Sequence, residues 1–220
     1  MNILCFGASG GIGKILHNGL GEYKFIGLHY CHKKSYTIAK CDITNYKKVQ
    51  EIVDIVAEHR QIDILINCGA VMIDELVHKS DNFENVVNIN LIGTYNTIRA
   101  VLPYMRKQQH GRIINMSSIV GYCPQIGTGA YTTAKAGLEG LCKSVALENA
   151  KLNISCNNIA LGYFDTGMFY KLSLENQKQY LSKIPFGRLG ESKEIISTVK
   201  YLIETPYITG QTIHVNGGLY

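Results

Sequence analysis

Short apolar runs alternate with longer segments in which apolar residues recur at helical spacing, along the whole chain. Most of the apolar runs are continuous, which is typical of strands that a parallel sheet buries on both faces. These runs predict seven strands, at residues 2–6, 24–30, 37–41, 63–67, 112–116, 153–161 and 211–215. Amphipathic spacing predicts helices around residues 12–20 and at residues 46–58, 83–108, 132–149 and 191–203.

Strand and helix therefore alternate throughout, and this order predicts an α/β fold. We expect a doubly wound Rossmann-type sandwich, with a seven-stranded, mostly parallel sheet and helices on both faces. Only about seven residues separate the second and third strands, which is too few for a crossover helix, so we expect a loop or a single turn there. No repeat or linker interrupts the pattern, and residues 1–220 are expected to form one domain.

Composition narrows the class of protein. The chain is 46% hydrophobic with a net charge of +5, which excludes dominant disorder. This charge is mild for 220 residues and favours a solvated surface over a nucleic-acid-binding one. No apolar run reaches the length of a membrane span, and no basic start precedes an apolar stretch, so we expect neither a membrane helix nor a signal peptide.

The seven cysteines form no Cys-x-x-Cys motif and predict free thiols in a reducing cytoplasm. The seven histidines lack metal-site spacing, so no metal is expected.

A glycine-rich segment at residues 7–13 follows the first predicted strand and opens the first helix. Such a turn lets the backbone approach a ligand closely and aims helix N–H groups at an anion, which favours a pyrophosphate. Gly7, Gly11 and Gly13 fit the spacing Gly-x-x-x-Gly-x-Gly, whereas Gly7, Gly10 and Gly13 fit Gly-x-x-Gly-x-x-Gly. The spacing alone leaves both readings open.

Tyr131 and Lys135 stand four residues apart and share one face of a predicted helix. A free phenol has a pKa near 10 and is a poor acid or base at neutral pH. A cation about 4 Å away at an effective dielectric of about 20 favours the phenolate by about 4 kcal/mol, so we expect Lys135 to lower the pKa of Tyr131. Ser118 ends the fifth predicted strand, where α/β sheets place their ligands. Asn90 lies inside a long predicted helix, an unfavourable place for asparagine unless its amide is paired.

With these residues in order, the sequence resembles the classical short-chain dehydrogenase/reductase family across nearly its whole length, and is most similar to 3-oxoacyl-acyl-carrier-protein reductase-like members. The matching motifs are the glycine-rich loop 7–13, Asn67-Cys68-Gly69-Ala70, Asn90-Leu91-Ile92-Gly93, the trio Ser118, Tyr131 and Lys135, residues 158–166 and residues 210–218.

The resemblance implies a catalytic tetrad and a nicotinamide cofactor. Tyr131 would be the general acid for ketone reduction or the base for alcohol oxidation, and Lys135 would lower its pKa and hold the nicotinamide ribose. Ser118 would bind the substrate oxygen, and Asn90 would kink its helix and hold a water in a proton relay. Besides Tyr131 and Lys135, cofactor contacts are expected at Gly7, Ser9, Gly10, Gly11, Ile12, Gly13, Lys33, Asp42, Ile43, Asn67, Cys68, Gly69, Gly162, Phe164 and Thr166.

Several positions depart from the family pattern. Leu161 replaces the usual proline before Gly162, and Cys68-Gly69 stands where Asn-Ala is usual. The second predicted strand ends in Tyr30-Cys31, without the acidic residue that would accept from a ribose 2′-hydroxyl. Lys33 and Lys34 follow and can pair with a 2′-phosphate, so we expect NADP(H) to be preferred and NAD(H) to be usable. The alternative is that both lysines are solvated loop residues.

The resemblance predicts an NAD(P)H-dependent reduction of a ketone or 3-oxoacyl group to an alcohol, or its reverse, by a cytoplasmic enzyme without nucleic-acid or membrane partners. Residues 166–189 would form an apolar substrate lid, and two long helices would build a homotetramer or a homodimer. A carrier-protein substrate would need a basic rim, for which Arg99, Arg106, Lys107 and Arg112 are available. The alternatives are a non-catalytic NAD(P)-sensing member of the same fold and an extended-type epimerase.

Overall fold

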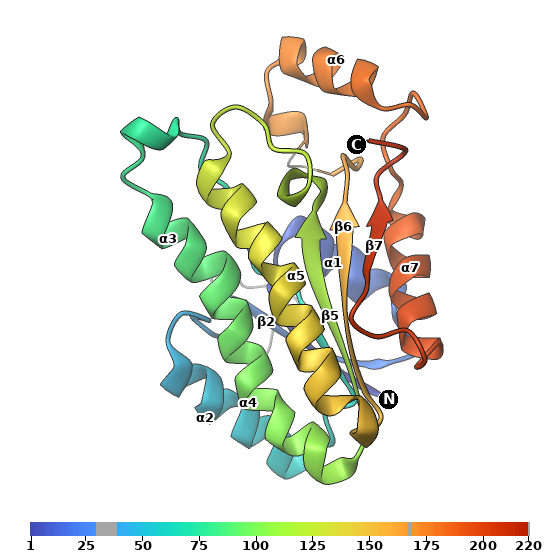
Figure 1. The fold of residues 1–220 in the computed structure, drawn as a ribbon. Coiled ribbons are helices and arrows are strands. Elements are labelled where there is room, and N and C mark those ends of the chain that lie inside the picture. The colour runs from blue at the N-terminus through green and yellow to red at the C-terminus, as the bar shows by residue number, and fades with distance from the viewer. Residues whose placement is uncertain (30–38, 167–168, 220) are drawn as a thin grey trace.

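The computed structural model describes residues 1–29, 39–166 and 169–219, and its strands form one sheet with the order β3-β2-β1-β4-β5-β6-β7. Every strand pairing in it is parallel. The strands are β1 (Asn2–Phe6), β2 (Lys24–His29), β3 (Ala39–Lys40), β4 (Ile64–Asn67), β5 (Gly111–Ser118), β6 (Ile154–Leu161) and β7 (Thr212–Val215). Their carboxyl ends meet at one edge, toward which the arrowheads of β5, β6 and β7 point in Figure 1. The predicted fold class is confirmed.

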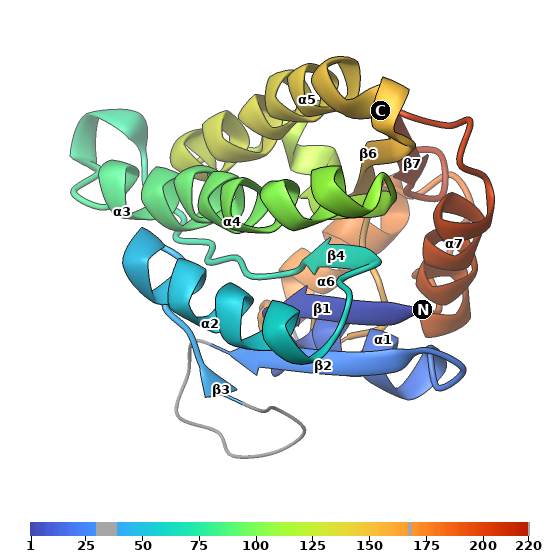
Figure 2. The same cartoon turned by 90° about the horizontal axis from the view of Figure 1, so that it is seen from below.

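Helices cover both faces of this sheet (Figures 1 and 2). They are α1 (Gly11–Gly19), α2 (Tyr46–His59), α3 (Phe83–Val87), α4 (Gly93–Gln108), α5 (Gly129–Asn149), α6 (Leu174–Lys183) and α7 (Ser192–Glu204). One core layer packs α2, α4 and α5 against the sheet, and the second packs α1 and α7 against its other face. The continuous apolar runs follow from this, because a central strand such as β4 is buried on both sides.

The helix predicted over residues 83–108 is not α-helical throughout. A π-helical turn at Asn88–Ile92 separates α3 from α4. Turns of this kind widen the helix by one residue and are frequent at functional sites. The uniform helix prediction was wrong at this turn, since the contacts of Asn90 described below lie outside the helix and leave no mark on helical spacing.

Two other boundaries differ in ways that matter for the site. Helix α5 begins at Gly129 instead of residue 132, so that Tyr131 lies inside its first turn. Strand β5 continues to Ser118, which pairs with Leu161 of β6. The predicted short crossover between β2 and β3 falls on residues 30–38, outside the described residues. Within the described ranges, no helix is both long and apolar enough to cross a bilayer.

Candidate active site and cofactor site

The glycine turn after β1 packs directly on the loop after β4, at the carboxyl edge of the sheet. Gly7 has a φ of +89°, and a Cβ atom there would lie 2.7 Å from the carbonyl carbon of Cys68 and closer still to the amide nitrogen of Gly69. A Cβ on Gly13 would lie 2.5 Å from the Cα of Ala8. Glycine is therefore required at both positions, by conformation at Gly7 and by close helix–strand packing at Gly13.

Helix α1 starts in this turn with no side-chain cap. Gly10 is its N-cap residue and has no side chain that could accept a hydrogen bond from the first N–H groups of the helix. These N–H groups, together with the helix dipole, form a cradle suited to a pyrophosphate. A Cβ on Gly11 would lie 3.9 Å from the side chain of Thr166, so the loop after β6 borders the same space. Ser9 and Ile12 lie partly exposed on the same turn.

The next part of this edge is formed by the ends of β3 and β4 and the residues that follow them, namely Asp42, Ile43, Asn67 and Gly69. The carboxylate of Asp42 accepts hydrogen bonds from the backbone N–H of Thr44 at 2.9 Å and from its hydroxyl at 2.7 Å, which fixes the turn after β3. The side chain of Ile43 lies 3.2 Å from the position of a Cβ on Gly69. The described residues of the predicted cofactor set thus gather along one edge, whereas Lys33 lies outside the described residues.

Ser118, Tyr131 and Lys135 meet where β5 ends beside the first turns of α5. Tyr131 is 9% exposed and Lys135 only 3%. The ammonium of Lys135 donates a hydrogen bond to the carbonyl oxygen of Met116 at 2.7 Å, and its nitrogen lies 5.5 Å from the centre of the Tyr131 ring. The hydroxyl of Ser118 accepts from the backbone N–H of Val120 at 3.2 Å. The sequence predicted that these three residues would meet, but not the role of Met116.

The pKa of Tyr131 contradicts the sequence-based expectation. Burial raises it to about 12, and the hydrogen bond with Ser118 lowers it only in part. Burial also lowers the pKa of Lys135 to about 8, and the charge of Cys68 raises it in part. Desolvation of both groups disfavours phenolate and ammonium alike, and it outweighs the lowering expected from the charge of Lys135. The phenol is therefore protonated at neutral pH, and most Lys135 side chains carry a charge.

Asn90 is fully buried in the π-helical turn and holds the loop that follows β4. Its side-chain oxygen accepts from the N–H of Val71 at 2.8 Å, and its amide nitrogen donates to the carbonyl of Val71 at 2.7 Å. The hydroxyl of Thr94 donates to the Asn90 carbonyl at 3.0 Å. Both polar ends of the Asn90 side chain are therefore used on Val71, which packs near Tyr131 in one small apolar cluster.

We expect Asn90→Ala to lower the free energy of unfolding by about 2 kcal/mol, because it leaves the half-buried N–H and carbonyl of Val71 without the Asn90 hydrogen bonds. Urea unfolding followed by circular dichroism measures this difference. Asn88→Ala, in the same turn but exposed, is the matched control and should change stability by less than about 0.5 kcal/mol. Equal effects of the two substitutions would show that the hydrogen bonds between Asn90 and Val71 do not stabilise the fold.

A row of buried amides crosses the sheet behind Asn67 and was not predicted. Asn67 donates to Asn115 at 2.9 Å, Asn115 to Asn158 at 3.0 Å, and Asn158 to the carbonyl of Leu138 at 3.1 Å. The hydroxyl of Thr97 completes the row by donating to the Asn67 oxygen at 2.7 Å. Asn67, Asn115 and Asn158 occupy one register across β4, β5 and β6. The available signal was the presence of asparagine in three otherwise apolar runs.

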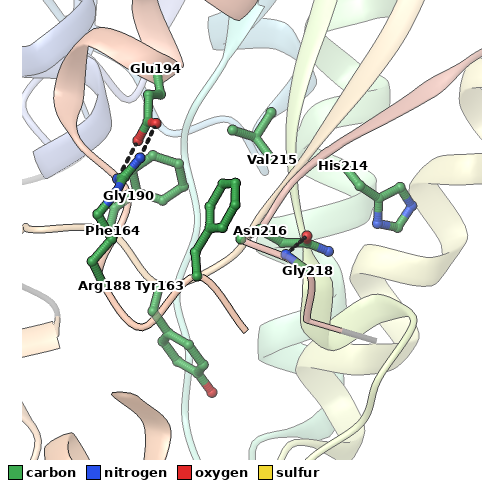
Figure 3. A pocket seen from close by; sticks show the side chains of 11 residues that line it. Tyr163, Phe164, Arg188, Gly190, Glu194, His214, Val215, Asn216 and Gly218 are labelled. Atoms are coloured by element: carbon green, nitrogen blue, oxygen red, sulfur yellow. Dashed lines mark hydrogen bonds and ion pairs between the residues drawn. The ribbon is translucent and has the colours of Figure 1, made fainter. Parts of the chain in front are cut away.

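The third side of the site follows β6. A Cβ on Gly162 would lie 2.7 Å from the Cα of Asn216, so this glycine is required by close packing. The ring of Phe164 is buried against Gly190 in the core, whereas the side chain of Thr166 borders the glycine turn at Gly11. A cavity of about 340 Å³ lies below this segment, with the Arg188–Glu194 ion pair on its wall (Figure 3). Its lining includes Phe164 but, among described residues, none of Ser118, Tyr131 or Lys135.

Of the basic residues suggested for a carrier-protein rim, Arg106, Lys107 and Arg112 do not lie at this edge. Arg112 is the second residue of β5, at the amino end of the sheet, where it is 5% exposed and donates to the carbonyl of Asn153 at 2.8 Å. Arg106 and Lys107 end α4, next to that same end of β5. Within the described ranges, no three His, Cys, Asp or Glu side chains are grouped so that they can hold a metal ion.

A seven-stranded parallel sheet with a glycine turn at its carboxyl edge is a dinucleotide-binding architecture, and comparison with known proteins identifies its family. A family model described as Enoyl-(Acyl carrier protein) reductase matches residues 29–220. The chain is 36% identical to the 3-oxoacyl-[acyl-carrier-protein] reductase FabG of Rickettsia bellii, over 98% of this chain and 95% of that protein. It is 34% identical to the FabG of Staphylococcus aureus strain Mu50, over 99% and 97%.

A solved structure agrees with these relatives. The 3-oxoacyl-[acyl-carrier protein] reductase from Brucella melitensis ATCC 23457 superposes with a TM-score of 0.90 at 26% identity, over 100% of this chain and 91% of the other. The chain belongs to the short-chain dehydrogenase/reductase family and is an oxidoreductase that acts on carbonyl or hydroxyl groups.

Proposed function

We propose that this enzyme reduces the 3-oxo group of an acyl thioester to a hydroxyl group, with NADPH as the reductant. The observation that carries the proposal is the meeting of Ser118, Tyr131 and Lys135 beside the glycine turn. The names of the relatives support the substrate class, since they are 3-oxoacyl-acyl-carrier-protein reductases that align over nearly their whole length.

The residues present fit a dinucleotide. Gly7 and Gly13 leave a cradle that a Cβ would fill, and the uncapped start of α1 offers N–H groups to a pyrophosphate. Asp42, Ile43, Asn67 and Gly69 would line the adenosine side, and Thr166 would bind the carboxamide. When bound, the cofactor supplies the hydride, and the protein supplies orientation and protons.

Tyr131 would donate the proton to the carbonyl oxygen as that oxygen gains charge. With a pKa raised to about 12, its phenol is in the protonated form that reduction requires. The Ser118 hydroxyl would donate a second hydrogen bond to the same oxygen. Lys135, charged at neutral pH and held by the Met116 carbonyl, would orient the nicotinamide ribose and oppose the charge left on Tyr131. Asn90 would act as a positioning residue through Val71.

We further propose that residues 166–189 form the substrate lid of a single catalytic domain. Helix α6 lies over the carboxyl edge of the sheet (Figure 1). The ring of Tyr180 on this helix stacks on that of Tyr163 at 4.8 Å, and Phe169 meets Tyr163 at 6.0 Å. This aromatic contact ties the lid to the end of β6 and would give the substrate an apolar wall.

A substrate panel tests the proposed reaction and separates it from its alternatives. NADPH consumption is measured with acetoacetyl and crotonyl thioesters of coenzyme A or acyl carrier protein. We expect reduction of the acetoacetyl thioester with a kcat/KM at least about tenfold above that of the crotonyl thioester. A preference for the crotonyl thioester would instead support enoyl reduction, which the matched family model names. NADPH binding without turnover of any carbonyl substrate would support the non-catalytic sensor.

Cofactor preference is expected to depend on Lys33 and Lys34. Their ammonium groups would pair with the 2′-phosphate, and no acidic residue ends β2 to repel it. We expect a higher kcat/KM with NADPH than with NADH in the wild type, and a smaller ratio in the double variant Lys33→Ala, Lys34→Ala. A wild-type preference for NADH, or an unchanged ratio in the variant, would overturn this assignment.

We also propose a cytoplasmic homotetramer built from two-fold contacts, with a homodimer as its smaller form. Leu138 and Val145 of α5 are buried in the core, and α5 instead presents Leu147, which is 86% exposed, while α4 presents Tyr95. These exposed apolar side chains support α4 and α5 as an interface with a second copy. Light scattering at micromolar concentration should give a multiple of the 24.4 kDa chain mass; a monomer mass would refute the assembly.

A further inference from the structure

Two cysteines lie together directly beneath the glycine turn. Cys5 is fully buried in β1, and its strand partner in β4 is Ile66. Cys68 stands two positions beyond Ile66 and therefore faces the same side of the sheet. The two sulfur atoms are 3.9 Å apart, with the Cys5 thiol as donor to the Cys68 sulfur. Both residues belong to the core layer under α1 and α7.

The two thiols differ in access and surroundings. Cys68 is only partly buried and lies one residue past the end of β4, at the edge where the proposed cofactor site is located. Cys68 also lies close enough to Lys135 for its charge to raise the pKa of that lysine, against the effect of burial. A cation and a thiol donor beside a partly exposed cysteine are the surroundings in which thiolates react with oxidants. Cys5 has no access to solvent and can react only with a neighbour.

We propose that Cys68 is a site of reversible oxidation by peroxide and that Cys5 is its resolving thiol. In the first step the Cys68 thiolate attacks one oxygen of hydrogen peroxide, which gives the sulfenic acid at Cys68 and releases hydroxide. In the second step the Cys5 sulfur displaces the hydroxyl from the Cys68 sulfur, which forms the disulfide and releases water. Overall, two thiols and one peroxide give one disulfide and two waters, and a dithiol reagent reverses the reaction.

The disulfide would change the glycine turn, a consequence that rests on the proposed cofactor site. A disulfide needs its sulfur atoms about 2.0 Å apart, so the pair must approach. Cys5 lies in the interior of a strand paired on both sides, whereas Cys68 lies in a loop held by the bond from its N–H to the Phe6 carbonyl at 2.8 Å. Cys68 would therefore move, and with it the backbone of Gly69 that packs against Gly7.

The experiment treats the full-length protein with hydrogen peroxide, blocks free thiols with a maleimide and maps the digested peptides by mass spectrometry without reduction. The expected product is a Cys5–Cys68 linked peptide that dithiothreitol removes. NADPH affinity, measured by cofactor fluorescence, should fall by about tenfold or more in the oxidised protein, because the shifted turn would lose a hydrogen bond to the charged pyrophosphate, which is worth this order. It should recover after reduction.

Variants separate this reaction from general oxidation. Cys5→Ala should bind NADPH as the wild type does, keep its affinity better in peroxide, and accumulate a Cys68 sulfenic acid that dimedone traps. Cys142 belongs to another buried cysteine pair, and its thiol donates to the Cys156 carbonyl at 3.1 Å. The Cys142→Ala variant should respond to peroxide as the wild type does. The proposal is overturned if the peptide map, which needs no variant, shows no Cys5–Cys68 link or shows linkage only at other cysteines. If the reduced protein does not bind NADPH, the proposed cofactor site fails while the peptide map still decides the disulfide.

Discussion

Tyr131→Phe is expected to lower kcat by at least about 10²-fold, because it removes the only proposed proton donor to the carbonyl oxygen while keeping the ring. The phenol is buried at the end of β5 with Ser118 as its hydrogen-bonding neighbour, so no water takes its place without moving the surrounding side chains. NADPH affinity should be largely retained, since the glycine turn and Lys135 keep their proposed cofactor contacts. Steady-state kinetics with an acetoacetyl thioester and fluorescence titration with NADPH measure the two quantities separately.

Tyr104→Phe provides the matched control. It makes the same chemical change on α4, where the Tyr104 hydroxyl donates to Asp54 at 2.6 Å and the residue has no place in the proposed site. We expect its kcat to stay near that of the wild type. A Tyr131→Phe enzyme that turns over at the wild-type rate would remove Tyr131 from the mechanism.

Lys135→Met is expected to damage both turnover and cofactor binding. The substitution keeps the length of a buried side chain but removes the ammonium that would hold the ribose and oppose the charge on Tyr131. We expect kcat/KM to fall by at least about 10²-fold and the Kd for NADPH to rise by about tenfold, the usual order for losing a hydrogen bond from a charged group. Lys143→Met on the same helix, where the lysine is exposed and pairs with Glu139, should leave both values unchanged. An unchanged NADPH affinity in Lys135→Met would contradict the ribose role.

The same variant has a signature in the pH dependence of stability. Burial lowers the pKa of Lys135 to about 8 from its ordinary value of 10.5. Between these values the unfolded chain binds more protons than the folded one, so this group makes the free energy of unfolding rise with pH. The wild type should therefore gain stability relative to Lys135→Met from pH 8 to pH 10, by up to about 1.4 kcal/mol per pH unit. A constant difference between the two unfolding curves would show that Lys135 is not desolvated.

The sheet could be predicted because each strand is an apolar run bounded by turn residues. The site could be predicted because its motifs lie at the ends of strands. The register between neighbouring strands and the desolvation of the site residues could not be predicted from the sequence. Nothing in the spacing of Asn67, Asn115 and Asn158 indicates that they align across three strands, since strand pairing decides this. The π-helical turn depends on the partner of Asn90, Val71, which lies outside the helix.

The pKa of Tyr131 could not be predicted from the sequence for a related reason. A charge four residues away is visible in the sequence, but the burial of both groups is not, and burial outweighs the charge. The proximity of Cys5 and Cys68, 63 positions apart in the chain, also follows only from the pairing of β1 with β4.

The proposed reaction is tested most directly by following deuterium from NADPH labelled at both C4 positions into the product of an acetoacetyl thioester. We expect a 3-hydroxybutyryl thioester with one deuterium on carbon 3, formed by the wild type and by Tyr104→Phe but at least about 10²-fold more slowly by Tyr131→Phe. A protein that binds NADPH yet transfers no deuterium to carbon 3 of this substrate would contradict it.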